Sequence, residues 1–148
     1  MDNTPKEPGF LIIAAMFLLL WLAGSAWASW LGGWSALARR FAMTAPFAGT
    51  KWGWQTAYMR WWAHYKGILT LGVTPKGMYL AVFPLFRFRH PPLLIPWSEI
   101  RVRRTKFLFL EYCELHLGRE MEIPLRLRKN AAAKLQAAAG TWWPLEET

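Results

Sequence analysis

Three histidines are the side chains whose type could support catalysis or metal binding. His64, His90 and His116 fall in three separate predicted elements, without cysteines or paired carboxylates at the spacing of a metal site. No aspartate follows Asp2, so a histidine base would lack its commonest orienting partner. The sequence also has no glycine-rich phosphate loop and no nucleophile elbow. We therefore predict a protein that is not an enzyme and that uses no metal or cofactor.

Arginines in alternating positions are the second group of side chains that could bind a ligand. Two arginines separated by one residue lie on the same face of a strand, and rows of guanidiniums suit contacts with phosphates or carboxylates. Arginine is also a common choice for the solvated face of a strand without any ligand. We predict contacts with anionic lipid or an acidic partner at Arg87, Arg89, Arg101, Arg103, Arg126 and Arg128.

A long apolar run near the N-terminus determines where these arginines would act. No residue between Pro8 and Ala38 is charged. A helix over residues 10–31 would be about 33 Å long, which is enough to cross the hydrocarbon of a bilayer. We predict a transmembrane helix there, a disordered segment at residues 1–9, and an interfacial helix and linker at residues 32–50.

Aromatic and basic residues at the end of the apolar run are typical of a membrane interface. Tryptophan is enriched where lipid meets water, and arginine there contacts headgroups. Trp34, Leu37 and Phe41 share one face of a predicted short helix. The residues that we expect at the interface are Trp27, Trp30, Trp34, Arg39 and Arg40.

The charge is distributed unevenly along the chain. Residues 39–134 hold 17 of the 18 lysines and arginines, whereas only Lys6 precedes the apolar run. We predict a single span in the plasma (inner) membrane, and the positive-inside rule predicts that the N-terminus lies outside and the domain in the cytoplasm. The net charge of +9 is also typical of nucleic-acid binding. Tethering to a bilayer makes anionic lipid or a protein partner the better prediction.

A cleaved signal peptide is the alternative explanation of the apolar run. Ala26 and Ala28 flank Trp27 in the small-x-small pattern of a cleavage site. A signal peptide begins with positive charge, however, and here Asp2 and Glu7 offset Lys6. If cleavage followed Ala28, the product would be an exported small β-barrel that carries an apolar ligand.

Short β-favouring runs with turn residues between them fill the rest of the chain. The clearest hairpin joins residues 67–73 to 78–83 through the turn Thr74–Gly77. Further strands are predicted at residues 86–89, 93–97, 101–110, 111–117 and 121–128, with Cys113 buried. Trp54 is expected to pack inside the domain, while the placement of Trp61 and Trp62 is left open. An alanine-rich helix over residues 131–139 ends at Gly140.

Two segments of this β region resemble a known family. The runs Gly72–Leu80 (GVTPKGMYL) and Leu94–Ile100 (LIPWSEI) resemble a hairpin and a strand end found in bacterial pleckstrin-homology-like (PH-like) and GRAM-like domains. The resemblance covers residues 51–140 and leaves residues 141–148 as a tail. It implies a mainly β (α+β) fold, a bent barrel of about seven strands capped by a C-terminal helix. Members serve mostly as lipid, peptide or self-assembly modules, often fused to membrane helices.

The phosphoinositide signature of eukaryotic relatives is not met. That signature has a lysine followed by K/R-x-R across the first hairpin, but Lys76 lies in the turn and Arg87 and Arg89 come one strand later. We therefore predict a non-catalytic, single-pass membrane-anchored PH-like binding or scaffolding module. Its partners would be the bilayer and an acidic protein, or a second copy of itself. The alternative is an accessory subunit of a membrane enzyme complex.

Overall fold

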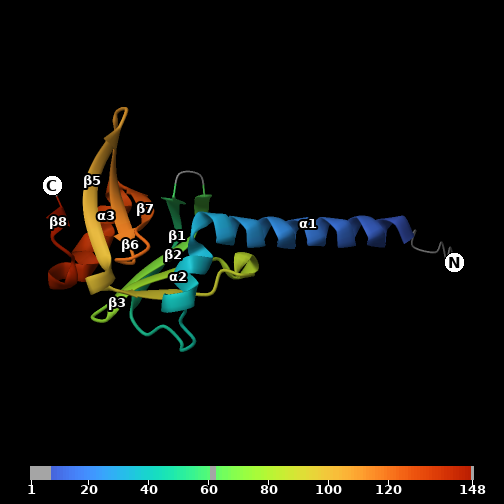
Figure 1. Ribbon diagram of the computed structural model, residues 1–148, viewed down its shortest axis with the longest axis horizontal. Helices are drawn as coiled ribbons and strands as arrows, with labels where there is room; N and C mark the ends of the chain where they lie inside the picture. Colours follow the sequence, from blue (N-terminus) through green and yellow to red (C-terminus); the bar gives the residue numbers. More distant parts are fainter. Residues whose placement is uncertain (1–7, 61–62, 148) are drawn as a thin grey trace.

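A long apolar helix and a curled sheet make up the protein in a computed structural model, which describes residues 8–60 and 63–147. Helix α1 (Pro8–Gly32) projects away from the sheet, and the free end of the helix is the N-terminal one (Figure 1). Its segment Pro8–Trp27 is long and apolar enough to cross a membrane, and none of its residues is buried in the described protein. Most of the predicted disordered segment lies outside the described residues, and Pro8 and Gly9 belong to α1.

Helix α2 (Trp34–Phe41) follows a sharp turn at Gly33, whose φ of 90° ends α1. Trp34, Leu37 and Phe41 form its buried face, as their spacing predicted. That face packs against the domain instead of a bilayer, because Trp34 is fully buried and its Nε1 donates a hydrogen bond of 3.0 Å to the Pro91 carbonyl. The prediction that Trp34 lies at the membrane interface is therefore wrong.

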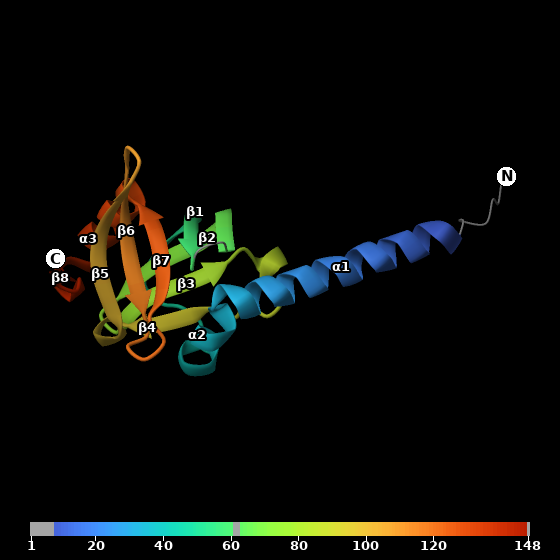
Figure 2. The same ribbon diagram turned by 45° about the horizontal axis from the view of Figure 1, so that its top comes forward.

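In the described residues, eight strands form one curled half-barrel sheet in the order β4-β3-β2-β1-β7-β6-β5-β8 (Figure 2). Neighbouring strands are antiparallel except β5 and β8, which are parallel. The fold is α+β with most of the domain in the sheet. The strands are β1 (Thr50–Met59), β2 (Ala63–Thr74), β3 (Gly77–Val82), β4 (Leu93–Pro96), β5 (Ile100–Phe107), β6 (Leu110–Leu117), β7 (Ile123–Arg128) and β8 (Glu146–Glu147).

The concave side of the sheet holds the core, and helix α3 (Lys129–Ala139) packs against β2, β6 and β7. Alternation along the strands places one apolar set inside, as in β6, where Cys113, Leu115 and Leu117 are buried. Ala132 and Leu135 form the buried inner face of α3. The helix stops at Gly140, whose φ is 55°. Burial raises the pKa of the Cys113 thiol to about 11, so this cysteine is an inert core residue.

The C-terminal residues contribute the eighth strand. The short 3-10 helix η3 (Gly140–Trp142) leads to β8, whose Glu146 and Glu147 pair with Val102 and Arg103 of β5. The prediction of about seven strands missed this one because two glutamates carry no β-favouring pattern. Residues 141–148 therefore include a strand of the sheet, where the sequence predicted only a tail.

Three further predictions need correction. Residues 86–89 are not a strand: the 3-10 helix η1 (Pro84–Phe86) and a turn occupy this segment, where Pro84 and Pro91 supply no amide for a ladder. Trp54 is 77% exposed, because a register shift between Trp52 and Gln55 turns it outward with a φ of 58°. Residues 101–110 are interrupted by a turn between β5 and β6. Trp61 and Trp62 lie outside the described residues.

Candidate functional site

The four predicted strand arginines share the outer face of β5 and β7, but they do not form an unbroken basic surface. Strand β6 lies between them, and its Glu114 is in register with both Arg103 and Arg126. Arg126 donates a hydrogen bond of 3.1 Å to Glu114. Charges of opposite sign therefore alternate across the strands, which weakens this face as a site for anions.

Ion pairs also occupy the ends of this face. Arg101 lies 2.7 Å from a carboxylate oxygen of Glu122 and 3.8 Å from one of Glu147. On the opposite face of β5, Arg104, which the sequence analysis did not single out, donates to Glu146 of β8 at 2.6 Å and holds the pKa of that carboxyl below its usual range. Arg128 remains exposed at the end of β7. These side chains stabilise the edge of the sheet more than they prepare it for a ligand.

Arg87 and Arg89 lie elsewhere, on the connection between β3 and β4 (residues 83–92), which we call the proximal loop. Ser25 of α1 donates a hydrogen bond of 3.2 Å to the Phe88 carbonyl, and the rings of Trp21 and Phe86 are 5.9 Å apart. The loop therefore runs beside the base of α1. Its Leu85 and Phe88 side chains are exposed, as are both arginines.

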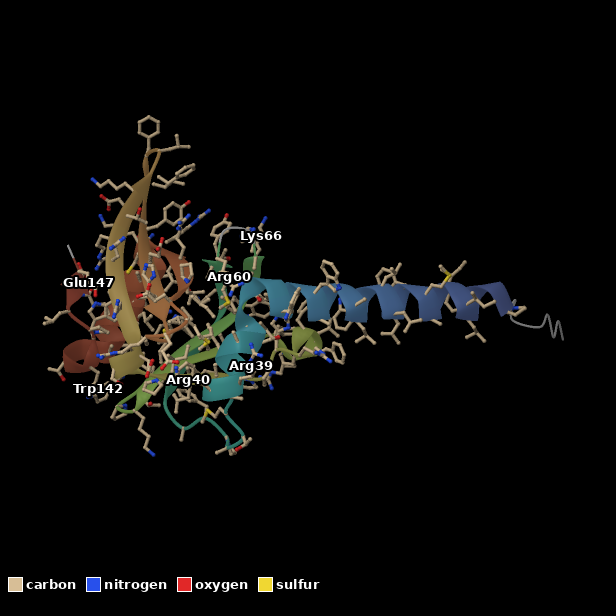
Figure 3. All side chains as sticks on the ribbon, in the orientation of Figure 1. Arg39, Arg40, Arg60, Lys66, Trp142 and Glu147 are labelled. Atoms are coloured by element: carbon tan, nitrogen blue, oxygen red, sulfur yellow. The ribbon has the colours of Figure 1, made fainter. Side chains whose placement is uncertain are left out.

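Two more arginines surround the base of α1. Figure 3 shows Arg39 and Arg60 on the side of the domain from which α1 emerges. Arg40 is directed to the sheet, with its guanidinium 3.7 Å from Glu99 and 3.6 Å from Glu120. Trp27 and Trp30 are exposed on α1. We call the set Arg39, Arg60, Arg87 and Arg89 the basal arginines.

The turn between β5 and β6 is an apolar surface that the sequence analysis missed. Its residues Phe107, Leu108, Phe109 and Leu110, here called the hairpin tip, have side chains between 53% and 101% exposed. Phe107 pairs with Leu110, which leaves Leu108 and Phe109 as a two-residue turn. The signal in the sequence is the apolar run between Lys106 and Glu111, two residues that prove to be cross-strand neighbours.

Basic residues surround the base of the hairpin tip. Lys106 lies 3.6 Å from Glu111, and Lys129 of α3 lies 2.5 Å from the other oxygen of the same carboxylate. The contact with Lys129 holds the pKa of Glu111 below its usual range. Near the tip, the single negative charge of Glu111 is outnumbered by the positive charges of two lysines and the exposed Arg128. The surroundings of the tip are therefore cationic.

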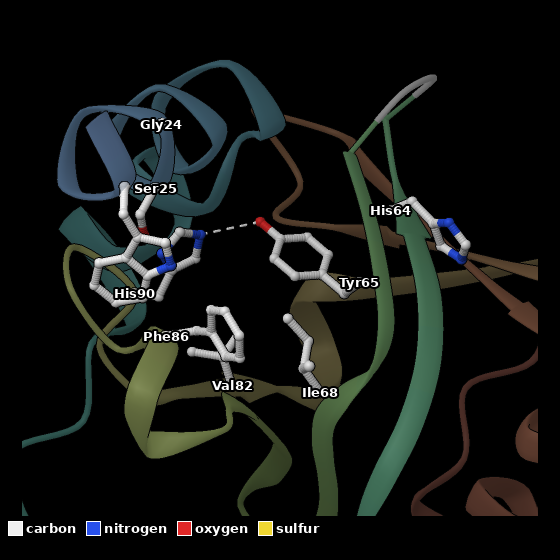
Figure 4. Close-up of a pocket in the computed structure, with 9 residues that line it drawn as sticks. Gly24, Ser25, His64, Tyr65, Ile68, Val82, Phe86 and His90 are labelled. Carbon is white, nitrogen blue, oxygen red and sulfur yellow. Dashed lines mark hydrogen bonds between the residues drawn. The ribbon is translucent and has the colours of Figure 1, made fainter. Parts of the chain in front are cut away.

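The three histidines lie apart from one another in the fold. His90 is buried, with its Nδ1 3.0 Å from the Phe88 carbonyl and its Nε2 3.2 Å from the Tyr65 hydroxyl (Figure 4). A carbonyl only accepts, so Nδ1 carries the proton and Tyr65 donates to Nε2. Burial lowers the pKa of His90 and raises that of Tyr65, which keeps both groups neutral. The ring of Trp34 packs at a tilt against both side chains, so this pair fixes the proximal loop to β2 and α2.

The other two histidines lie on the outer surface. His64 stacks on Tyr58 with ring centroids 4.1 Å apart, and His116 lies 2.8 Å from Glu114. In the part of the chain that the structure describes, no group of three or more His, Cys, Asp or Glu side chains is placed to hold a metal ion. No protein-family model and no curated protein sequence matches this chain.

Proposed function

We propose that this chain is a single-pass membrane-anchored PH-like module, not itself catalytic, that docks a protein partner through its hairpin tip. The exposed tip is the observation that carries the proposal. Four neighbouring apolar side chains in water are unfavourable, and burying a leucine or phenylalanine side chain contributes about 1.5–3 kcal/mol. A contiguous apolar surface of this kind typically marks an interaction site.

The conformation of the turn supports the same conclusion. Two-residue hairpin turns favour glycine, asparagine or aspartate because a central residue has positive φ. Here Leu108 adopts a φ of 56°, which costs a side chain of this type about 1–2 kcal/mol. An apolar pair thus stands where polar turn residues would be more stable. Contact with a partner would explain why leucine and phenylalanine occupy this turn although they destabilise the folded domain.

The position of the tip favours a protein over the bilayer that would hold α1. The β5–β6 hairpin points across the axis of α1, and its tip lies well away from that helix (Figures 1 and 2). The two lysines and Arg128 near the tip suit a partner whose apolar groove has an acidic rim. A second copy fits less well, because both chains would carry a net charge of +9.

The membrane side of the proposal rests on α1 and the basal arginines. An apolar helix of sufficient length emerges among Arg39, Arg60, Arg87 and Arg89. In this orientation, exposed apolar side chains of the proximal loop reach the interface and the arginines meet anionic headgroups. Contact with lipid is thus assigned to the basal arginines in place of the strand faces, and the positive-inside rule puts the domain in the cytoplasm.

An uncleaved α1 is also favoured by its contacts with the domain. Cleavage after Ala28 would remove Ser25, which bonds to the Phe88 carbonyl, and Trp21, which packs on Phe86. The intact mass of the protein purified from membranes tests this directly. A mature N-terminus at Ser29 would contradict the anchor and support the exported carrier.

Site-specific photocrosslinking in intact membranes tests the docking function. A photoreactive phenylalanine analogue replaces Phe109 in the full chain, and the matched control carries it at Lys76, which lies in the β2–β3 turn. We expect a discrete protein adduct from position 109 that is absent from position 76. Adducts with phospholipid, or none from position 109, would contradict docking to a protein. An adduct with an enzyme would identify the chain as an accessory subunit.

The proposed orientation has its own test. In a Cys113→Ala background, a cysteine introduced at the exposed Lys76 is treated with a membrane-impermeant maleimide. We expect labelling in inverted membrane vesicles and none in intact cells. Labelling of intact cells would place the domain outside, whatever the docking experiment shows.

A further inference from the structure

A cavity of about 330 Å³ lies between α1 and the sheet, apart from the hairpin tip. Gly24 and Ser25 of α1 line one side, while Ile68 of β2 and Val82 of β3 line the other. Phe86 of the proximal loop closes part of the remaining wall (Figure 4). The volume falls within the range of about 300–1,000 Å³ that is typical of small-molecule sites.

The cavity offers hydrocarbon-like walls and few free polar groups. Tyr65 and His90 lie at its edge, but the hydroxyl donates to Nε2 and Nδ1 donates to the Phe88 carbonyl. Ser25 donates to the same carbonyl. These three donors are therefore engaged within the protein, and the other polar atoms of the wall belong to the rings of Trp21 and His64. An apolar ligand would enter at the lowest desolvation cost, because it gives up no hydrogen bonds with water.

The wall formed by α1 indicates where such a ligand would come from. Trp21, Gly24 and Ser25 belong to the segment Pro8–Trp27 that is long and apolar enough to span a membrane. If α1 spans the bilayer, the cavity opens at the boundary of the hydrocarbon layer. A chain from a neighbouring lipid could then enter beside Gly24 without crossing water.

We propose that this cavity binds the acyl chain of a bilayer phospholipid. The inference rests on the membrane anchor of the proposed function and is independent of the hairpin tip. Gly24 lines the cavity, and no heavy atom lies within 4 Å of a Cβ built at that position, so the space beside it is free to admit a chain. The bound chain would fix the angle between α1 and the domain by filling the space between them.

The test uses the full chain in nanodiscs of phosphatidylethanolamine and phosphatidylglycerol that contain a phospholipid with a photoreactive group at the end of one acyl chain. Mass spectrometry then locates the adducts after illumination. We expect adducts on the domain residues Ile68, Val82 and Phe86 as well as on α1. Adducts confined to residues of α1 would overturn the proposal.

Filling the cavity supplies the matched comparison. Gly24→Leu places a side chain in the entrance, whereas Gly9→Leu adds the same side chain near the free end of α1, where a Cβ also meets no heavy atom within 4 Å. We expect loss of the domain adducts with Gly24→Leu and their retention with Gly9→Leu. Ile68→Phe fills the cavity from the sheet side and should cause the same loss. Undiminished domain adducts in both filled variants would overturn the proposal.

Alkaline carbonate extraction separates failure of the anchor from failure of the cavity site. Release of the native protein into the supernatant would show that α1 does not anchor it, and the proposed function and this inference would fail together. Retention in the membrane without adducts on the domain would overturn the acyl-chain site alone.

Discussion

Two turns among the described residues, β2–β3 and β5–β6, each connect neighbouring strands through two residues but have opposite chemistry. In the β2–β3 turn, the Thr74 hydroxyl accepts hydrogen bonds of 3.2 Å from the amides of Lys76 and Gly77. Pro75 favours the turn conformation through its fixed φ. In the β5–β6 turn, Leu108 has a φ of 56° and Phe109 is fully exposed.

The difference separates residues that stabilise the fold from residues that are available for contact. The β2–β3 turn uses residues that lower the free energy of the folded state and exposes little apolar surface. The β5–β6 turn raises that free energy through backbone strain and exposed apolar area. Substitutions in the two turns should therefore change stability in opposite directions, and only the β5–β6 turn should affect docking.

The largest effect on stability is expected for Gly77→Ala in the β2–β3 turn. A Cβ at Gly77 would overlap the carbonyl oxygen of Ile95 on β4, so the two backbones would have to separate. We expect a loss of about 3 kcal/mol in the free energy of unfolding, measured by denaturant titration in detergent. Leu108→Ala is the control in the other turn, and equal losses in both variants would contradict the comparison.

A smaller loss is expected for Thr74→Val in the same turn. Valine keeps the shape of threonine but removes the oxygen that accepts from two backbone amides. The loss should be about 1.5 kcal/mol, as for a helix cap of similar geometry. The same titration measures it, with Thr105→Val on β5 as the control. An unchanged free energy of unfolding would show that water replaces the hydroxyl without cost.

Leu108→Gly should have the opposite sign. Glycine adopts positive φ without the steric cost of leucine, although its greater freedom in the unfolded chain offsets part of the gain. We expect an increase of about 1 kcal/mol in the free energy of unfolding together with weaker crosslinking from position 109. A destabilised variant would show that Leu108 packs within the domain and would remove the argument from strain.

The same contrast explains which parts of the fold could be predicted from the sequence. The β2–β3 hairpin was predicted because threonine, proline and glycine act locally at fixed positions. Strand β6 and helix α3 were predicted because alternation and alanine content are also local. The β5–β6 turn was missed because its residues favour an extended strand, and the register with β6 that imposes the turn is a tertiary feature.

The candidate sites were less predictable for a related reason. Exposed tryptophans and arginines near α1 were expected from composition, and Trp27 and Trp30 are exposed. Trp34 has the same local signal, yet the Pro91 carbonyl and the ring of Tyr65 hold it in the core. Similarly, the alternating pattern predicted which face of the sheet Arg101 and Arg126 occupy. It did not predict their glutamate partners, Glu122 and Glu114, because these come from other segments of the chain.

The smallest effect on stability should accompany removal of one lysine from each turn. Lys106→Gln loses an exposed ion pair of 3.6 Å with Glu111, and exposed pairs of this kind contribute about 0–1 kcal/mol. Lys76→Gln removes an exposed charge from the other turn. Both variants should unfold within about 0.5 kcal/mol of the native protein.

Docking should nevertheless distinguish these two lysines. If the partner has an acidic rim, Lys106→Gln should reduce the adduct from position 109, and the reduction should shrink as ionic strength rises and screens the contact. Lys76→Gln should leave the adduct unchanged at every salt concentration. An equal reduction by both variants would indicate a general effect of net charge, and the lysines around the hairpin tip would then have no specific part in recognition.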